Sequence, residues 1–256
     1  MQLVPLSPEL EHRFWDIVRR DYADYYFFIF DWLLQKQRTQ IFLAIEANVI
    51  VGLMLIYDGY IVQLRGEAAA IRFLLANLTL QKVDVQVPSG CGNLLLEKYP
   101  HFELKENIIL MKVKKGQEQS NVTVEPQPLN AADAPAVAEL MHVCYPEMWS
   151  EISAEQVEVL MAAKEAIWLG IKVDGKLAAF GYAVQTPKVS HVTWIATHPR
   201  YQRRGYASSI VSSLVKECLV LSEEAIIYVV EDNIVAKHIY QKAGFTPYKS
   251  YVFLKT

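Results

Sequence analysis

The second half of the chain contains a short basic loop between an apolar strand pattern and an amphipathic helix pattern. Val189–Thr197 is predicted as a strand, and Tyr206–Leu221 has one apolar face at helical spacing. Gly205 directly precedes the helix, where its missing side chain lets the backbone approach a ligand closely. The first turn of a helix has unpaired N–H groups and partial positive charge, so it attracts phosphate. This succession therefore predicts a phosphate-binding loop in a sheet covered by helices.

Basic side chains surround this loop. Arg200, Arg203 and Arg204 add positive charge, and Ala207 leaves the start of the helix unobstructed. The positive charge is local, because the whole chain has a formal net charge of only -3. Such a small net charge does not indicate a nucleic-acid-binding protein. The loop is instead suited to a ligand with a compact diphosphate group.

The loop pattern is Gln202-x-x-Gly205-x-Ala207, and it follows a strand and a His-Pro pair. It resembles the acyl-CoA-binding signature Q/R-x-x-G-x-G/A of the GNAT superfamily of N-acetyltransferases. A second segment, Asn233–Phe245, resembles the family run N-x-x-A-x-x-x-Y-x-x-x-G-F. With the order of predicted strands and helices, the resemblance covers residues 121–256.

The resemblance implies acetyl-CoA as co-substrate, with its pyrophosphate on the backbone amides from Gln202 to Ala207. The pantetheine arm is expected to pair with Ile195–Thr197 as an added strand. Asn233 is expected to cap the next helix or to contact the arm. The expected cofactor-binding residues are Ile195, Ala196, Thr197, Gln202, Arg203, Arg204, Gly205, Tyr206, Ala207 and Asn233.

Three residues are candidates for proton transfer. Tyr240 lies two helical turns after Asn233, and the matching tyrosine of the family often protonates the departing CoA thiolate. The alternative is a packed aromatic residue with a satisfied hydroxyl. Glu231 and His191 are candidates for the base that deprotonates the acceptor amine. Glu231 could instead cap a helix, His191 could be a surface residue, and a water chain could replace either.

The remaining pattern indicates a mixed fold. Ile167–Val173 and Leu177–Gln185 flank Asp174-Gly175, which is a strong hairpin signal. Val122–Glu125 is also predicted as a short strand. The fold class is therefore α/β or α+β, and the resemblance implies a GNAT fold with a mixed, mostly antiparallel sheet flanked by helices.

The first half of the chain has features of a degenerate second copy. Val83–Val87 resembles Ile226–Val230, 143 positions further on, and at the same offset Phe102 matches Phe245 and Ile108–Lys112 matches Tyr251–Lys255. At that offset Gly90 stands for Asn233 and Glu97 for Tyr240, so this copy lacks the CoA signature. The predicted organisation is a degenerate GNAT-like domain at 1–113, a polar linker at 114–120 and a catalytic GNAT domain at 121–256. The alternative is two unrelated mixed domains with similar strand composition.

The cysteine content and the longest apolar runs argue against a disulfide-bonded, a metal-binding and a membrane-spanning protein. The three cysteines are far apart and lack metal-ligand spacing, so neither a disulfide framework nor a metal site is expected, and the cytoplasm is the expected compartment. The apolar runs are too short to span a membrane. The expected partners are an amine acceptor and, as is common in the family, a second copy of the chain, with no nucleic acid and no membrane.

The predicted function is an N-acetyltransferase that moves an acetyl group directly from acetyl-CoA to a primary amine of a small molecule or peptide. One alternative is an acyltransferase that uses a larger acyl-CoA, similar to glycine N-acyltransferase. Another is a non-catalytic module that senses acyl-CoA. An aminoacyl-tRNA-dependent transferase of tandem GNAT folds is a further alternative, and the intact pyrophosphate signature argues against it.

Overall fold

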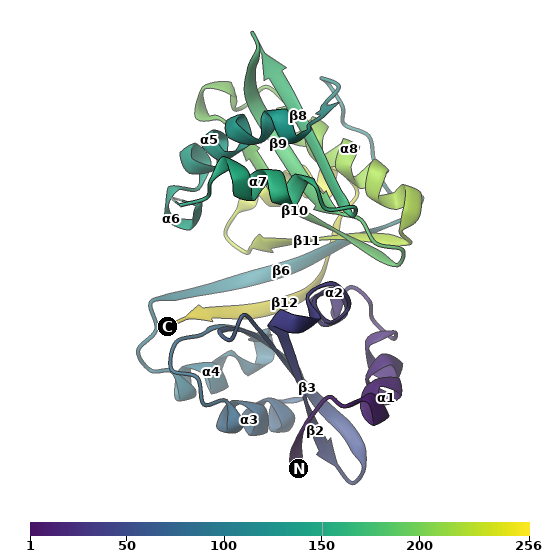
Figure 1. Ribbon diagram of the computed structural model, residues 1–256, viewed down its shortest axis with the longest axis vertical. Helices are drawn as coiled ribbons and strands as arrows, with labels where there is room; N and C mark the ends of the chain where they lie inside the picture. Colours follow the sequence, from purple (N-terminus) through teal and green to yellow (C-terminus); the bar gives the residue numbers. More distant parts are fainter. Residues whose placement is uncertain (150) are drawn as a thin grey trace. The chain divides into compact units, whose positions relative to one another are not determined.

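The structure is a computed structural model that describes residues 1–149 and 151–256. Their contacts divide the chain into two compact units (Figure 1). The N-terminal unit comprises Met1–Leu110, Val229–Asp232 and Tyr248–Thr256, and the C-terminal unit comprises Met111–Tyr228 and Asn233–Pro247. The predicted domains, 1–113 and 121–256, differ from this division because the end of the chain belongs to the N-terminal unit.

The sheet of the N-terminal unit has the strand order β1-β2-β3-β4-β5-β12. Its strands are β1 (Gln2–Pro5), β2 (Thr39–Glu46), β3 (Val49–Tyr57), β4 (Ile61–Gly66), β5 (Asp84–Pro88) and β12 (Thr246–Lys255). The β4–β5 pair is parallel, and the other pairs are antiparallel. Two further strands, β6 (Leu104–Lys114) and β11 (Glu224–Val230), contribute residues to both units, as β12 does through Thr246 and Pro247.

Helices cover both faces of this sheet. They are α1 (Pro8–Val18), α2 (Tyr26–Leu34), α3 (Ala68–Asn77) and α4 (Gly92–Lys98), with short 3-10 turns at Lys36–Arg38 and Ser89–Cys91. Leu53 and Leu55 of β3 pack with α1 and α2, whereas Met54 and Ile56 pack with α3 and α4. Since successive side chains of a strand point to opposite faces, this alternation explains why the central strands are apolar throughout.

A buried ion pair ties β12 into the N-terminal unit. Arg65 is only 2% exposed, and its Nε donates to Asp24 Oδ1 at 2.5 Å, while one Nη donates to Gln86 at 2.9 Å. Asp24 also accepts hydrogen bonds from the Tyr251 hydroxyl at 2.6 Å and from Lys249 Nζ at 2.5 Å. Burial opposes ionisation of Asp24, but the Arg65 guanidinium and these hydrogen bonds outweigh it and lower the pKa of the carboxyl.

The sheet of the C-terminal unit has the strand order β11-β10-β9-β8-β7. Its other strands are β7 (Gln127–Pro128), β8 (Ala166–Val173), β9 (Lys176–Val184) and β10 (Val189–Thr197). Asp174 and Gly175 form the predicted hairpin turn with φ values of 49° and 76°. The β10–β11 pair is parallel, and the others are antiparallel. The predicted fold class, a mostly antiparallel mixed sheet flanked by helices, is confirmed.

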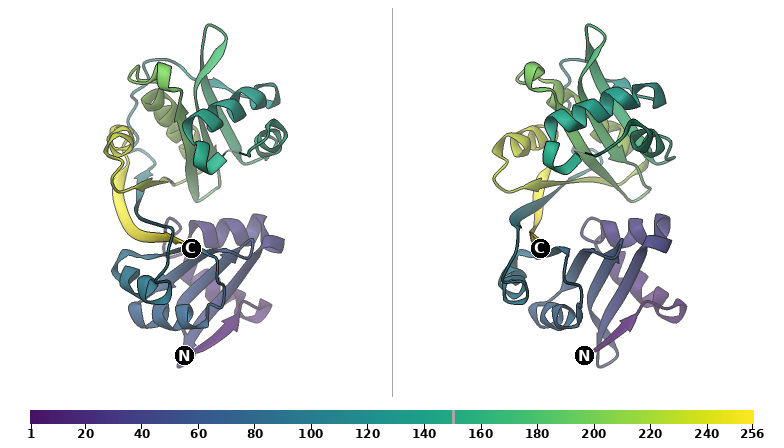
Figure 2. Two further views of the ribbon diagram at one scale, coloured as in Figure 1. Left: turned by 90° about the vertical axis from the view of Figure 1, so that its left-hand side faces the viewer. Right: turned by 60° about the vertical axis from the view of Figure 1, so that its left-hand side comes forward.

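The helices of this unit are α5 (Ala134–Cys144), α6 (Pro146–Trp149), α7 (Ala154–Met161), α8 (Tyr206–Leu221) and α9 (Ile234–Lys242), with 3-10 turns at Ala131–Asp133 and Pro199–Tyr201. Figure 2 shows α5 and α7 on one face of the sheet and α8 on the other. No helix within the described residues is long and apolar enough to cross a membrane.

The strand predicted at Val122–Glu125 is wrong, because that segment has no strand and β7 begins only at Gln127. The N–H groups of Thr123 and Val124 donate instead to the Ser209 hydroxyl on α8, at 3.0 and 3.2 Å. These hydrogen bonds with α8 take the place of a strand ladder.

Candidate functional site

Strand β10 separates from β11 and leaves one of its edges open. The two strands pair only over Val189–His191, whereas β10 continues to Thr197. On its other side β10 pairs with β9 through Thr197, and His198 N donates to Ala178 O of β9 at 2.9 Å. Because backbone groups of successive strand residues point to alternate sides, Ile195 and Thr197 direct their N–H and C=O groups to the open edge.

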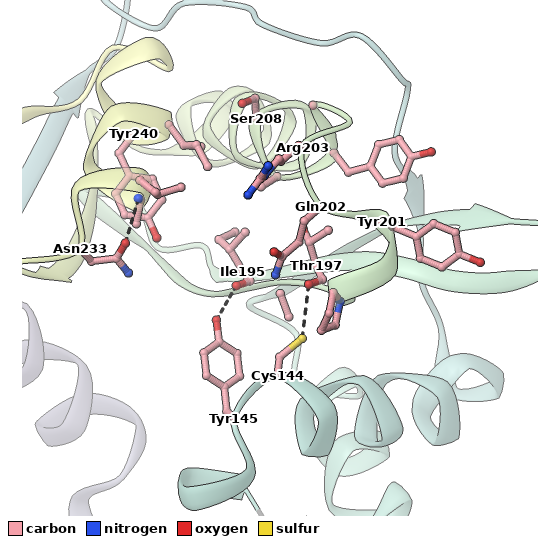
Figure 3. Close-up of a pocket in the computed structure, with 18 of the residues that line it drawn as sticks. Cys144, Tyr145, Ile195, Thr197, Tyr201, Gln202, Arg203, Ser208, Asn233 and Tyr240 are labelled. Carbon is pink, nitrogen blue, oxygen red and sulfur yellow. Dashed lines mark hydrogen bonds between the residues drawn. The ribbon is translucent and has the colours of Figure 1, made fainter.

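A cavity of about 680 Å³ lies along this open edge, within the C-terminal unit (Figure 3). It is lined by the end of α5, the end of β10, the following loop, the first turn of α8 and one side of α9. The predicted site residues that line it are Ile195, Ala196, Thr197, Gln202, Arg203, Gly205, Tyr206, Ala207, Asn233 and Tyr240. Arg204 is not among the lining residues, and its guanidinium lies over the Tyr201 ring, 5.4 Å from the centroid.

The loop before α8 depends on glycine at position 205. Gly205 has a φ of 79°, in the left-handed region, and it directly precedes the first helical residue. A Cβ at this position would lie only 2.7 Å from Thr123 Oγ1. Arg203 also has a positive φ of 60°, and His198 Nδ1 accepts a hydrogen bond from Arg200 N, which closes the turn. The loop conformation is therefore fixed by local backbone geometry and by the Thr123 side chain.

The contribution of the segment before β7 was missed in the sequence. Thr123 packs behind Gly205, and Ser209 holds it there through its hydroxyl. Ser212 accepts a hydrogen bond from Asn121 N at 3.1 Å. The available signal was the presence of two serines on the otherwise apolar buried face of α8. Buried hydroxyls need hydrogen-bond partners, and here the partners are backbone groups of this segment.

The end of α5 reaches the carbonyl groups of the open edge. The Tyr145 hydroxyl donates to Ile195 O at 2.6 Å, and Cys144 Sγ lies 3.6 Å from Thr197 O. Burial raises the pKa of both the Tyr145 phenol and the Cys144 thiol. A protonated thiol is a poor nucleophile, so Cys144 has the character of a packing residue.

Tyr240 and Asn233 both face the cavity from α9 (Figure 3). Burial, and to a lesser extent nearby Tyr145, raise the pKa of the Tyr240 phenol, so this hydroxyl keeps its proton at neutral pH. Asn233 Oδ1 accepts a hydrogen bond from Ala236 N at 3.0 Å. Of the two expectations for Asn233, the structure shows the helix cap.

The two residues predicted as candidate bases lie elsewhere. His191 is 7% exposed, and burial lowers its pKa to about 3, so its imidazole is a weak base. Its ring packs edge-on against Tyr228, which excludes the surface position considered from sequence. Glu231 belongs to the N-terminal unit, where it lines a different cavity with Lys105 and Ser250. Of the three predicted catalytic residues, Tyr240 alone lines the cavity beside β10.

Comparison with family models gave a match to the acetyltransferase (GNAT) family over residues 134–245. This range contains the open edge of β10, the loop and α9. A search of the curated proteins found no match to the chain.

Solved structures resemble the chain over its whole length. A protein from Drosophila has a TM-score of 0.77 and 16% identity, and the match covers 99% of this chain and 97% of that chain. A GNAT-family acetyltransferase from Colwellia psychrerythraea has a TM-score of 0.62 and 14% identity, covering 100% and 99%. A tandem GNAT protein from the clavulanic acid biosynthesis pathway has a TM-score of 0.62 and 14% identity, covering 100% and 98%. At these identities the likeness shows a shared fold, and it includes the N-terminal unit.

Proposed function

Because residues 134–245 match the acetyltransferase (GNAT) family, we propose that the protein transfers an acetyl group from acetyl-CoA to a primary amine of a small molecule or peptide. The observation that carries this proposal is the cavity itself. It combines a glycine-containing loop at a helix N-terminus, a strand edge without a partner strand and a protonated phenol in one continuous lining.

The pyrophosphate of acetyl-CoA would bind at the loop from Gln202 to Ala207. Helix α8 is 16 residues long, and its first N–H groups have no intrahelical partners. These N–H groups and the helix dipole stabilise phosphate, and Arg203 in the cavity lining adds positive charge. Gly205 keeps this place free of a side chain.

The pantetheine arm would lie along the open edge of β10. Thr197 and Ile195 direct backbone groups to that edge, so an extended amide chain can add to it as a further strand. The arm then runs from the loop toward Ile195. The thioester carbonyl would lie at the end of this run, where an open-edge N–H can donate to the developing oxyanion.

Acetyl transfer would then proceed in one encounter of the two substrates. The neutral amine nitrogen attacks the thioester carbonyl carbon, the new C–N bond forms and the C–S bond breaks. The departing thiolate takes the phenolic proton of Tyr240, whose raised pKa keeps that proton available at neutral pH. The proton that the amine nitrogen loses as the amide forms then returns, through solvent, to the Tyr240 oxygen and restores the phenol.

The Tyr240→Phe variant is expected to lower kcat by about 100-fold, because general acids contribute about 10²–10⁴ to such rates. The KM for acetyl-CoA should stay nearly unchanged, since the hydroxyl acts on the leaving thiolate. In the wild type, kcat should not fall through phenol ionisation between about pH 7 and 10, because the pKa is raised. Steady-state kinetics across this range provide the measurement. Tyr99→Phe, which removes a phenolic hydroxyl in the N-terminal unit, is the control, and an unaltered kcat in Tyr240→Phe would show that another group donates the proton.

Calorimetric titration of acetyl-CoA into the wild type tests the proposed function. We expect saturable binding with one site per chain, because the CoA signature occurs only in the second copy. Titrations with longer acyl-CoAs test the alternative of a larger acyl donor, and turnover with an amine library separates an enzyme from a sensing module. A folded protein that binds no acyl-CoA would refute both the enzyme and the sensor.

A further inference from the structure

Three aromatic rings lie side by side on adjacent strands of the C-terminal unit. Trp168 on β8 pairs in register with Tyr182 on β9, which pairs in turn with Trp194 on β10. The Trp168 and Tyr182 rings are stacked with centroids 4.3 Å apart, and the Tyr182 and Trp194 centroids are 5.2 Å apart. The three side chains therefore form one continuous aromatic surface.

This surface belongs to the sheet face opposite α8. A Cβ at Gly181 would meet the side chains of Ile210 and Ile195, so positions 181 and 195 face α8. Tyr182 and Trp194 are their chain neighbours and therefore point to the other face. Helix α6 supplies a fourth ring there, since Trp149 packs edge-on against Trp194 with centroids 4.7 Å apart. We refer to Trp149, Trp168, Tyr182 and Trp194 as the aromatic cluster.

The aromatic cluster adjoins the end of the cavity where the thioester would lie. Trp194 directly precedes Ile195, the cavity residue that is furthest along β10 from the phosphate loop. Trp149 N donates to Tyr145 O at 2.9 Å, and the Tyr145 hydroxyl binds Ile195 O. One helical turn thus separates the cavity lining from the fourth ring. Trp149 and Trp194 are thus joined to the cavity-lining residues Tyr145 and Ile195, although neither ring is itself part of the lining.

The cluster has a buried floor and a partly open rim. Trp168 and Tyr182 are 4% and 8% exposed, whereas Trp149 and Trp194 are half-buried. Trp168 Nε1 is buried and has no hydrogen-bond acceptor among the described residues. The part of the cluster that a ligand can reach is therefore its rim, Trp149 and Trp194.

The geometry points to an acceptor amine that carries an aromatic ring, with the aromatic cluster as its specificity-determining surface. This inference rests on the proposed acetyl transfer. Aromatic rings gain from edge-to-face and offset contacts beyond the apolar area that they bury. The half-buried rings of Trp149 and Trp194, next to the cavity-lining residues Tyr145 and Ile195, offer such contacts. An aliphatic amine of equal size would bury the same area without them.

The test compares 2-phenylethylamine with 2-cyclohexylethylamine at saturating acetyl-CoA. We expect the wild type to prefer the aromatic amine by about tenfold in kcat/KM. Trp149→Leu should abolish that preference through a higher KM for the aromatic amine, with the KM for acetyl-CoA unchanged. Trp149→Phe should restore most of the preference. Met148→Leu, which introduces leucine at the exposed neighbouring position, should keep the wild-type preference for the aromatic amine.

Amine binding is also measured directly by saturation-transfer NMR, with and without bound CoA, so that the result is independent of turnover. Absence of saturable 2-phenylethylamine binding would overturn the inference, even where acetyl-CoA binds and the proposed function stands. Equal losses for both amines in Trp149→Leu would also overturn it, because they would assign Trp149 to packing alone. The inference would also be overturned if the enzyme discriminated between acyl groups of the acyl-CoA but not between the two amines.

Discussion

Gly205→Glu is expected to lower the affinity for acetyl-CoA by about 100-fold or more, which corresponds to about 2.7 kcal/mol. The new side chain would strain a residue with a φ of 79° and would collide with Thr123 Oγ1 behind the loop. It would also place a carboxylate beside the phosphates. Calorimetric titration of acetyl-CoA into both proteins measures the effect.

The hairpin turn between β8 and β9 offers a matched control. Gly175 has a φ of 76°, close to that of Gly205, but a Cβ there would meet nothing within 4 Å. Gly175→Glu therefore adds the same charge and a similar backbone strain, away from the cavity lining. We expect it to bind acetyl-CoA as the wild type does. Equal affinities for the two variants would contradict the assignment of the phosphate site to this loop.

Asp24→Asn is expected to destabilise the N-terminal unit by about 3–5 kcal/mol, because it leaves the Arg65 guanidinium buried without its counter-charge. Arg65 is 2% exposed, and Asp24 is its ion-pair partner at 2.5 Å. The substitution also weakens the hydrogen bonds that Asp24 accepts from Lys249 and Tyr251. Urea unfolding followed by circular dichroism provides the free energy.

The exposed ion pair of Arg38 with Asp58 provides a control for the effect of Asp24→Asn on the free energy of unfolding. Its side chains are 54% and 27% exposed, and solvent-exposed pairs contribute at most about 1 kcal/mol. Asp58→Asn should therefore change the unfolding free energy only slightly. If Asp24→Asn were equally mild, the buried pair would not be what holds β12 in the N-terminal unit.

The contribution of Asp24 to the free energy of unfolding should decrease in acidic solution. The folded-state pKa of this carboxyl is lowered, whereas in the unfolded chain it is close to about 3.9. The stabilisation is therefore fully present above the unfolded pKa and is lost as pH falls through the folded pKa. The difference in unfolding free energy between wild type and Asp24→Asn should be constant from about pH 5 to 8 and should shrink in more acidic solution.

The parts of the site that could be predicted from sequence are those that local backbone chemistry decides. Gly205 before an amphipathic helix and Asp174-Gly175 between two strands impose their conformations within a few residues. Tyr240 could be placed because helical spacing puts it on the same side of α9 as the cavity-lining Asn233.

The parts that could not be predicted depend on partners far along the chain. Whether His191 is exposed or buried is decided by neighbouring elements, and burial changes its imidazole from a candidate base into a weak one. The lateral register of Trp168, Tyr182 and Trp194 requires the strand order, which spacing alone does not give. The ion pair of Asp24 with Arg65 joins residues that are 41 positions apart. The hydrogen bond from Tyr251 to Asp24 joins residues that are 227 positions apart.

The assignment of Tyr248–Thr256 to the N-terminal unit also fixes an order of events during synthesis. The ribosome makes residues 1–110 first, yet the strand that pairs with β5 is made only after residues 111–247. Until it emerges, β5 has an unpaired edge on that side and Arg65 lacks the hydroxyl and ammonium groups that share its counter-charge. The N-terminal unit, although its synthesis begins first, therefore cannot finish folding until residues 248–256 have been made, and a nascent chain stalled before residue 248 would expose that edge to aggregation.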